Sequence, residues 1–64
     1  MSRMKWKVMI NCEHSGETYS DEYSGIWHYN YADAVAEAKK AQKELRRRDP
    51  HFRFCFLREF LDVL

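Results

Sequence analysis

The sequence predicts a small α+β domain in which two strands are followed by one helix and a third strand, with the helix packed on one face of a three-stranded sheet. Near residues 6–12, 23–29 and 52–57, bulky residues recur at every second position, which is the period of half-buried strands. Between them, residues 31–45 carry apolar side chains at helical spacing. A chain of 64 residues has room for a single domain, 1–64, with a thin core.

The first strand and its turn are marked by alternation followed by a glycine. Bulky residues alternate with polar ones from residue 5 to residue 13, and Met9 on the polar side is the exception. We expect Trp6 and Val8 to lie in the core. The next four residues have turn composition, because Gly16 adopts positive φ without steric cost. The bulky members of the alternation are Trp6, Val8, Ile10 and Cys12.

The second strand is less regular. The polar, acidic stretch 18–22 is either a loop or the distorted start of this strand. Alternation returns at Tyr23 and predicts two distinct faces. One face would carry Tyr23, Gly25, Trp27 and Tyr29, and the other Ile26 and His28. We expect the first two strands to pair as an antiparallel hairpin.

The helix is the best-defined element. Asn30 is suited to be an N-cap, and Asp49-Pro50 cannot continue a helix, so we expect a helix from about Tyr31 to Arg48. Three arginines in the last turn suit the negative end of the helix dipole. Half of the buried stripe is alanine, which lets the helix sit close to the sheet. The stripe consists of Tyr31, Ala34, Val35, Ala38, Ala41 and Leu45.

The third strand is the most apolar, and its end is ambiguous. Phe52, Phe54 and Phe56 are expected on one face of the sheet. The tail 57–64 fits either a short helical turn, which we favour from the spacing of its apolar residues up to Leu64, or a longer strand. Because the helix returns the chain to the end of the sheet at which the second strand begins, the second and third strands run parallel. A right-handed crossover then places the first strand between them, in the order 2-1-3.

Charge is strongly polarised along the chain, although the net charge is only +1. Residues 11–38 contain six acids and no Lys or Arg, whereas residues 39–58 contain eight Lys or Arg and two acids. The simplest interpretation is a solvated helix face that complements its own dipole, and the functional one is a surface that binds phosphates or an acidic protein. The helical basic residues are Lys39, Lys40, Lys43, Arg46, Arg47 and Arg48, to which Arg53 and Arg58 could add.

The sequence gives little support for a metal centre or an active site. Zinc ligands usually come in close pairs, and the only such pair is Cys12 with His14. A nucleophile beside a histidine can be drawn from Cys12 or Ser15, but a domain this thin rarely holds a substrate pocket. We therefore expect no catalysis, no metal and no cofactor. The zinc candidates are Cys12, Glu13, His14, His28, His51 and Cys55.

The best-supported expectation is a non-enzymatic protein-interaction module. One helix cannot cover both faces of a sheet, so Phe54 and Phe56 should stay exposed unless the tail folds over them. This favours a homodimer or docking on a larger protein, with nucleic-acid binding by the basic helix face as the alternative. The chain's plan resembles that of many small proteins of bacteria and their phages, which implies a binder or inhibitor of a larger protein.

The sequence also predicts a cytosolic location. No run is apolar enough for a signal peptide or a membrane span. The two cysteines are too few to read as a disulfide framework, and we expect them to be reduced core residues.

Overall fold

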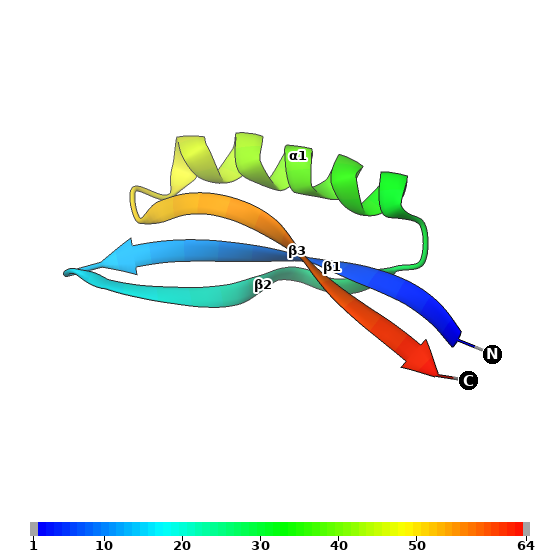
Figure 1. Ribbon diagram of the computed structural model, residues 1–64. Coiled ribbons are helices and arrows are strands. Elements are labelled where there is room, and N and C mark those ends of the chain that lie inside the picture. Colours follow the sequence, from blue (N-terminus) through cyan, green and yellow to red (C-terminus); the bar gives the residue numbers. More distant parts are fainter. Residues whose placement is uncertain (1, 64) are drawn as a thin grey trace.

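The computed structural model describes residues 2–63 and has the element order β-β-α-β (Figure 1). β1 spans Ser2–His14, β2 spans Glu17–His28, α1 spans Tyr31–Arg48 and β3 spans Phe52–Val63. The strands form one sheet, and α1 lies across a single face of it (Figure 1). The predicted α+β class is confirmed, and the molecule is a thin slab of 44 × 22 × 13 Å.

β1 is the central strand and pairs antiparallel with both neighbours, in the order β2-β1-β3. The predicted topology is therefore confirmed. Residues that face each other across an antiparallel ladder share a face of the sheet. The ring of Trp6 lies 5.4 Å from that of Tyr31 in α1, measured between centroids. Even-numbered residues of β1 therefore face α1, and odd-numbered residues face away from it.

A two-residue turn joins β1 to β2. Both of its residues have positive φ, 54° at Ser15 and 81° at Gly16. This is typical of the two-residue type I′ hairpin turn, whose backbone twist matches that of the flanking strands. β2 begins directly afterwards at Glu17, so the stretch 18–22 is part of the strand rather than a loop.

A bulge in β2 separates aromatic residues that were expected on one face. Trp27 pairs with Lys7 on the face away from α1, whereas the Tyr23 hydroxyl donates a hydrogen bond to Glu44 of α1 at 2.8 Å. The β1–β2 register shifts just beyond Lys7, where Gly25 has φ 79°. The prediction that Tyr23 and Trp27 share a face was wrong, because extra residues in a bulge reverse the alternation.

The limits of α1 are as predicted, and both ends are capped. The Asn30 side chain accepts a hydrogen bond from the Ala32 amide at 2.9 Å, and its own backbone is extended, as at an N-cap. At the other end the Asp49 amide donates to the Leu45 carbonyl at 2.9 Å. The three arginines of the last turn lie beside the negative end of the helix dipole.

The core lies between α1 and β1 and is built from small side chains. Ala34 and Ala41 of α1 and Val8 of β1 have no exposed surface, and Cys12 is nearly as buried. Because alanine has no side chain beyond Cβ, the helix approaches the sheet closely. Val8 is a core residue, as predicted, whereas Trp6 is only half-buried.

β3 continues to Val63, so the expected helical turn over 57–64 was wrong. The tail pairs with the first half of β1 as far as the Ser2–Val63 pair. A strand gains a hydrogen-bonding partner along its whole length, whereas one isolated helical turn has a high nucleation cost for very few bonds. Leu64, the last member of the expected helical stripe, lies outside the described residues. The tail therefore leaves the face opposite α1 uncovered.

A second irregularity separates the phenylalanines of β3. Phe52 pairs with Cys12 on the α1 side, whereas Phe54 pairs with Asn11 and lies on the opposite face together with Phe56. The register shifts between these two β1 residues, so one residue of β3 is left without a direct partner. The prediction that all three phenylalanines share a face was therefore wrong for Phe52.

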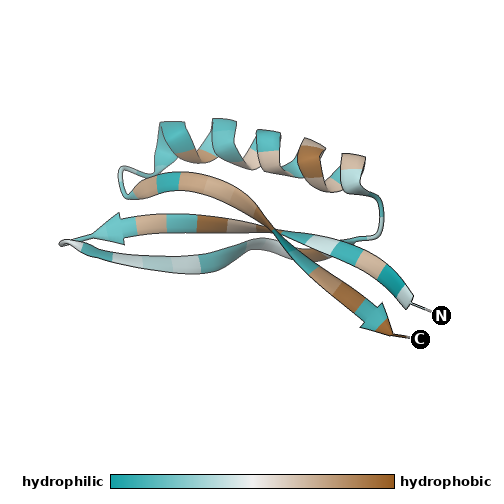
Figure 2. Ribbon diagram, in the orientation of Figure 1, coloured by the Kyte–Doolittle hydropathy of each residue, from teal (hydrophilic) through white to brown (hydrophobic). Residues whose placement is uncertain are grey.

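Hydropathy follows these layers. Figure 2 shows that most hydrophobic residues lie on the strands and that the C-terminal half of α1 is mainly hydrophilic. Within residues 2–63, no helix has both the length and the apolar character needed to cross a membrane.

We expect Ala41→Leu to lower the free energy of unfolding by about 1–3 kcal/mol, because extra atoms must be forced into a packed core. Ala41 is fully buried, whereas Ala36 is exposed on the same helix. Ala36→Leu is therefore the matched control and should be nearly neutral. Urea denaturation followed by circular dichroism measures both, and equal midpoints would show that α1 does not pack closely at Ala41.

Candidate functional site

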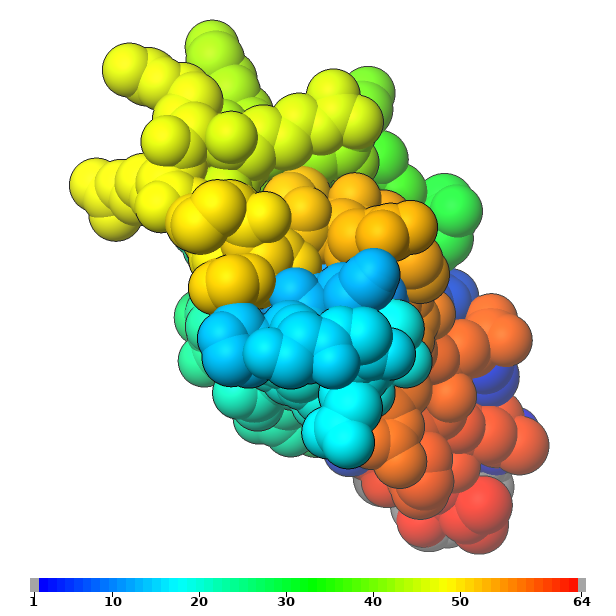
Figure 3. All heavy atoms as spheres, turned by 90° about the vertical axis from the view of Figure 1, so that its left-hand side faces the viewer, coloured from blue at the N-terminus to red at the C-terminus, as the bar shows by residue number. Residues whose placement is uncertain are grey.

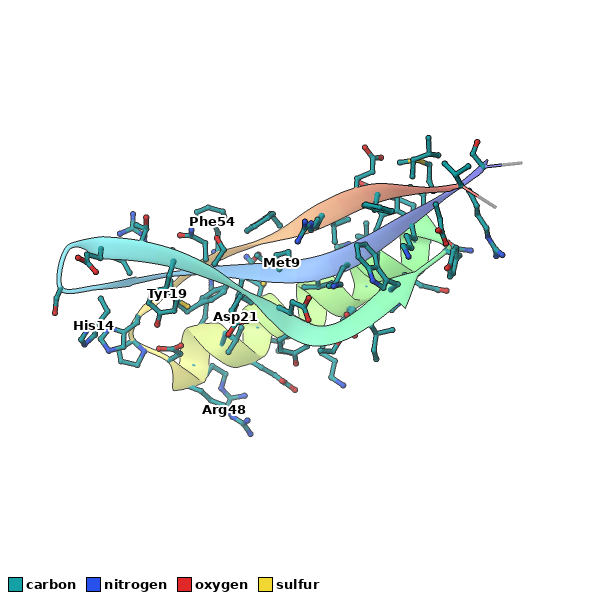
Figure 4. The ribbon with its side chains drawn as sticks, turned by 90° about the horizontal axis from the view of Figure 1, so that it is seen from below. Met9, His14, Tyr19, Asp21, Arg48 and Phe54 are labelled. Atoms are coloured by element: carbon teal, nitrogen blue, oxygen red, sulfur yellow. The ribbon has the colours of Figure 1, made fainter. Side chains whose placement is uncertain are left out.

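The face of the sheet that α1 leaves open carries exposed aromatic rings. The exposed fractions are 51% for Phe54, 37% for Phe56 and 49% for Phe60. All three pair with odd-numbered residues of β1, which places them on the face opposite α1. Figure 4 views this face and labels Phe54 beside Met9. We call Phe54, Phe56 and Phe60 the β3 aromatic surface.

Two lysines fill the middle of the same face. The Lys7 ammonium lies 4.2 Å from the ring centroid of Trp27, and that of Lys5 lies 4.7 Å from the same ring and 5.3 Å from Phe60. Lys7 also pairs with Glu22 and is only 8% exposed. Ring faces and a carboxylate thus compensate the burial of its charge. The two lysine side chains therefore cover the centre of the open face. The rings of the β3 aromatic surface remain exposed beside them.

β3 is also an edge strand. Between residues 2 and 63 no strand pairs with its outer side. It is 12 residues long and contains no Pro, Gly or Lys, which are among the residues that commonly protect sheet edges. An aromatic surface and an unpaired backbone edge therefore lie on the same strand.

The predicted basic residues of α1 form one solvent-facing surface. All six are exposed, and Figure 3 shows side chains from the C-terminal half of α1 projecting from the end of the molecule. None of the six forms an ion pair with another residue in the described part of the chain, where the pairs are Lys5–Asp62, Lys7–Glu22, His28–Glu37 and Arg53–Glu13. We call this surface the basic stripe, composed of Lys39, Lys40, Lys43, Arg46, Arg47 and Arg48.

The two arginines of β3 do not extend the basic stripe. Arg53 donates to both carboxylate oxygens of Glu13, at 3.0 and 3.2 Å. Arg58 pairs with Lys7 in the ladder and therefore lies on the face opposite α1. The expectation that Arg58 adds to the helix face was wrong, because the strand alternation directs it to the other layer.

Two hollows lie along the basic stripe and have volumes of about 330 and 410 Å³. Both are lined by side chains of α1, and the smaller one includes the half-buried Glu44, which accepts a hydrogen bond from Tyr23 of β2. Their lining residues are Glu44, Arg47 and Arg48 for one, and Lys39, Gln42, Lys43, Arg46 and Arg47 for the other.

Three of the six acidic residues in the stretch 11–38 are engaged within the fold. Glu13, Glu22 and Glu37 each pair with a basic side chain of the same molecule. Glu17 and Asp21 are exposed and form no ion pair with any residue from 2 to 63. The acidic region therefore presents less free charge to a partner than the basic stripe does.

The zinc candidates are not brought together. The rings of His14 and His51 stack edge-to-face at 4.5 Å beside the β1–β2 turn. His28 pairs with Trp6 near the far end of β2 and contacts Glu37 at 3.1 Å. Among residues 2–63, no group of three or more His, Cys, Asp or Glu side chains is placed to hold a metal ion.

The thiols are free and face α1. Burial, and then the nearby Asp49 carboxylate, raises the pKa of Cys12, whose Sγ lies 4.0 Å from that carboxylate. Burial, and then Cys12, raises the pKa of Cys55. A thiol with a raised pKa is protonated at neutral pH and is a poor nucleophile. Cys12 therefore lacks the activation that a catalytic cysteine needs.

The sequence identified Phe54 and Phe56 but missed the rest of the open face. Phe60 was assigned to a helical stripe, although it continues the even-numbered alternation of the two earlier phenylalanines. The lysine–tryptophan contacts could not be found by alternation alone, because the bulge in β2 sets the face of Trp27.

No protein-family model, no curated protein and no solved structure matches the chain. What these surfaces can bind follows from their own chemistry. The β3 aromatic surface and the β3 edge suit another polypeptide, whereas the basic stripe suits an anion.

We expect the free energy of unfolding to fall as pH rises above about 8.5, the ordinary pKa of a free thiol. The raised pKa values of Cys12 and Cys55 keep both thiols protonated in the fold, whereas the unfolded chain releases those protons at lower pH. The unfolded state then binds fewer protons, so stability is lost with rising pH.

Urea denaturation between pH 7 and 10 measures this slope, and each thiol contributes at most about 1.4 kcal/mol per pH unit. Cys12→Ala combined with Cys55→Ala should flatten the slope, whatever its effect on stability at pH 7. The same slope in this variant and in the unmodified chain would mean that the thiols do not cause it.

Proposed function

We propose that this chain is a non-enzymatic protein-interaction module, and that the β3 aromatic surface together with the edge of β3 is its contact site. The observation that carries the proposal is the exposure of Phe54, Phe56 and Phe60 on a face that neither α1 nor the tail covers. Contiguous exposed aromatic rings are typical of interfaces, where they supply large contact areas at low entropic cost.

The partner is either a second copy of the chain or a larger bacterial or phage protein that it binds or inhibits. We propose that it acts in the cytosol, where its two free thiols stay reduced. Both cysteines carry raised pKa values, and the two hollows are lined by α1 residues and contain neither cysteine, which supports a binding role over catalysis.

A photoreactive phenylalanine analogue at position 54 or 60 should form covalent adducts with a second polypeptide in cells that produce the protein. Ile26 is the matched control, because it is 54% exposed, close to the 51% of Phe54, but lies on β2. Few or no adducts are expected from position 26. Adducts that are equally frequent at all three positions, or absent at 54 and 60, would refute the proposed contact site.

Nucleic-acid binding by the basic stripe is a second candidate function, supported by one observation. Six exposed Lys and Arg side chains share one helix and have no ion-pair partner in residues 2–63. Unpaired cations in a row are available to phosphate groups, and their binding releases condensed counterions. Three of the acidic side chains that could repel a polyanion, Glu13, Glu22 and Glu37, contact basic side chains of the sheet.

If the basic stripe binds phosphates, Arg46→Glu with Arg47→Glu should weaken binding to single-stranded DNA of any sequence alike. The slope of log affinity against log salt should fall by roughly 0.7 for each phosphate that the variant no longer neutralises. Arg3→Glu, compared with Arg46→Glu alone, changes the net charge equally but lies on β1, outside α1 and β3. An equally large weakening in this control would indicate a general charge effect and refute the stripe as the site.

A further inference from the structure

We propose that the partner is a second copy of the chain, joined through antiparallel pairing of the two β3 strands about a twofold axis at Leu57. The two three-stranded sheets would then form one continuous six-stranded sheet. This inference rests on the proposed function and names the occupant of the β3 edge.

The two edges of the sheet differ in how well they are protected. The bulge at Gly25 interrupts β2 within the strand, whereas the bulge of β3 lies at its start, at Arg53, and a bulge is one of the usual defences of an edge. β3 keeps an uninterrupted register with β1 from Phe54 to Val63. Its outer edge is therefore a regular template on which another strand can pair.

The composition of β3 permits pairing with itself. Two arginines and two acids give the strand no net charge, so two copies do not repel each other as a whole. Five of the nine exposed large hydrophobic residues between 2 and 63 also belong to this strand, and an edge-to-edge dimer places two such sets together. They are Phe54, Phe56, Phe60, Leu61 and Val63.

Symmetry restricts the register. A twofold axis perpendicular to the sheet keeps both α1 helices on one side, so open-face residues must face open-face residues. The pairing must then be centred on one residue, whose two copies face each other across the axis. It cannot be centred between two successive residues, because these point to opposite faces. With the axis at Leu57, Phe54 faces Phe60 of the second copy, and Phe56 faces Arg58 of the second copy. The first pair is aromatic, and the second sets a guanidinium beside a ring.

Other positions of the axis are less favourable. An axis at Arg58 or Glu59 sets identical charges opposite each other, which is destabilising. Because the bulge at Arg53 puts Phe52 on the α1 side, an axis at Phe56 pairs only residues 54–58. An axis at Phe60 pairs residues 57–63 but leaves Phe54 and Phe56 outside the ladder. The axis at Leu57 pairs residues 54–60 of both strands, includes all three phenylalanines of the β3 aromatic surface and brings no like charges face to face.

Cysteine pairs test this register directly, in a Cys55→Ala background that removes the half-buried thiol and keeps the buried Cys12. Directly opposite residues of antiparallel strands have Cβ atoms within about 5.5 Å, close enough for a disulfide after small adjustments. Phe54→Cys and Phe60→Cys should each stay largely uncrosslinked alone. An equal mixture of the two should give a covalent dimer of twice 7.8 kDa under mild oxidation.

Phe56→Cys is the register control, since it faces Arg58 of the second copy and should not crosslink to itself. Rapid crosslinking of Phe56→Cys alone, or of Phe60→Cys alone, would overturn the axis at Leu57 in favour of one at that residue. No crosslink in any combination, together with a monomer at all concentrations in sedimentation, would overturn the second copy as partner.

The unmodified chain gives two independent readouts. Alternate amides of β3 should gain hydrogen-exchange protection as concentration rises, whereas those of β2 should not. The dimer also sets two basic stripes on one side of the sheet, so added salt should strengthen it by screening their repulsion. A dimer weakened by salt, or protection on β2, would instead indicate contact between the basic stripe and the acidic β2 and overturn the β3 pairing.

Failure of this inference differs from failure of the proposed function. Photoadducts at positions 54 and 60 that contain only a larger protein would refute the second copy and leave the interaction module intact. Absence of adducts would refute both.

Discussion

The whole arrangement depends on β1 being the central strand of a three-stranded sheet. It pairs along its length with β2 on one side and β3 on the other, and it contributes the most buried large side chain, Val8. Residues 2–63 contain no fourth strand that could cover either edge, and the one helix among them covers one face. The available contact surfaces follow from this constraint: two edges, one open face and the outer side of α1.

The lysines of β1 explain why the open face is not uniformly apolar. A sheet face without a covering layer must either expose its apolar rings or combine them with polar groups that tolerate water. Lys5 and Lys7 bring their ammonium groups to Trp27, and Glu22 compensates the more buried charge. Both lysines contact the β2 side of the face, whereas on the β3 side only Lys5 reaches an aromatic ring, that of Phe60. The phenylalanines that remain exposed on this face therefore all lie on β3.

Local signals in the sequence predicted the helix and the strand order, whereas the faces of individual residues depended on distant pairing. Asn30 and Asp49 cap α1 through bonds to residues two or four positions away, so the helix limits could be read directly. The conformation of the tail could not be predicted in this way, because it is a strand only through its hydrogen-bonding partners near Ser2, far away in the sequence. Bulges in β2 and β3 likewise arise from the fit between strands, and each reversed a face that strict alternation had assigned.

The two candidate functions use opposite layers of the molecule and do not compete. Pairing through β3 occupies an edge of the sheet, whereas the basic stripe lies on the outer side of α1. A twofold axis perpendicular to the sheet would carry both stripes to one side and double the number of cations available to a single polyanion. Because affinity for phosphates grows with the number of contacts, a dimer would bind a long polyanion far more tightly than a monomer. The mutual repulsion of the stripes would then be relieved by the ligand, so that polyanion binding and dimerisation would reinforce each other.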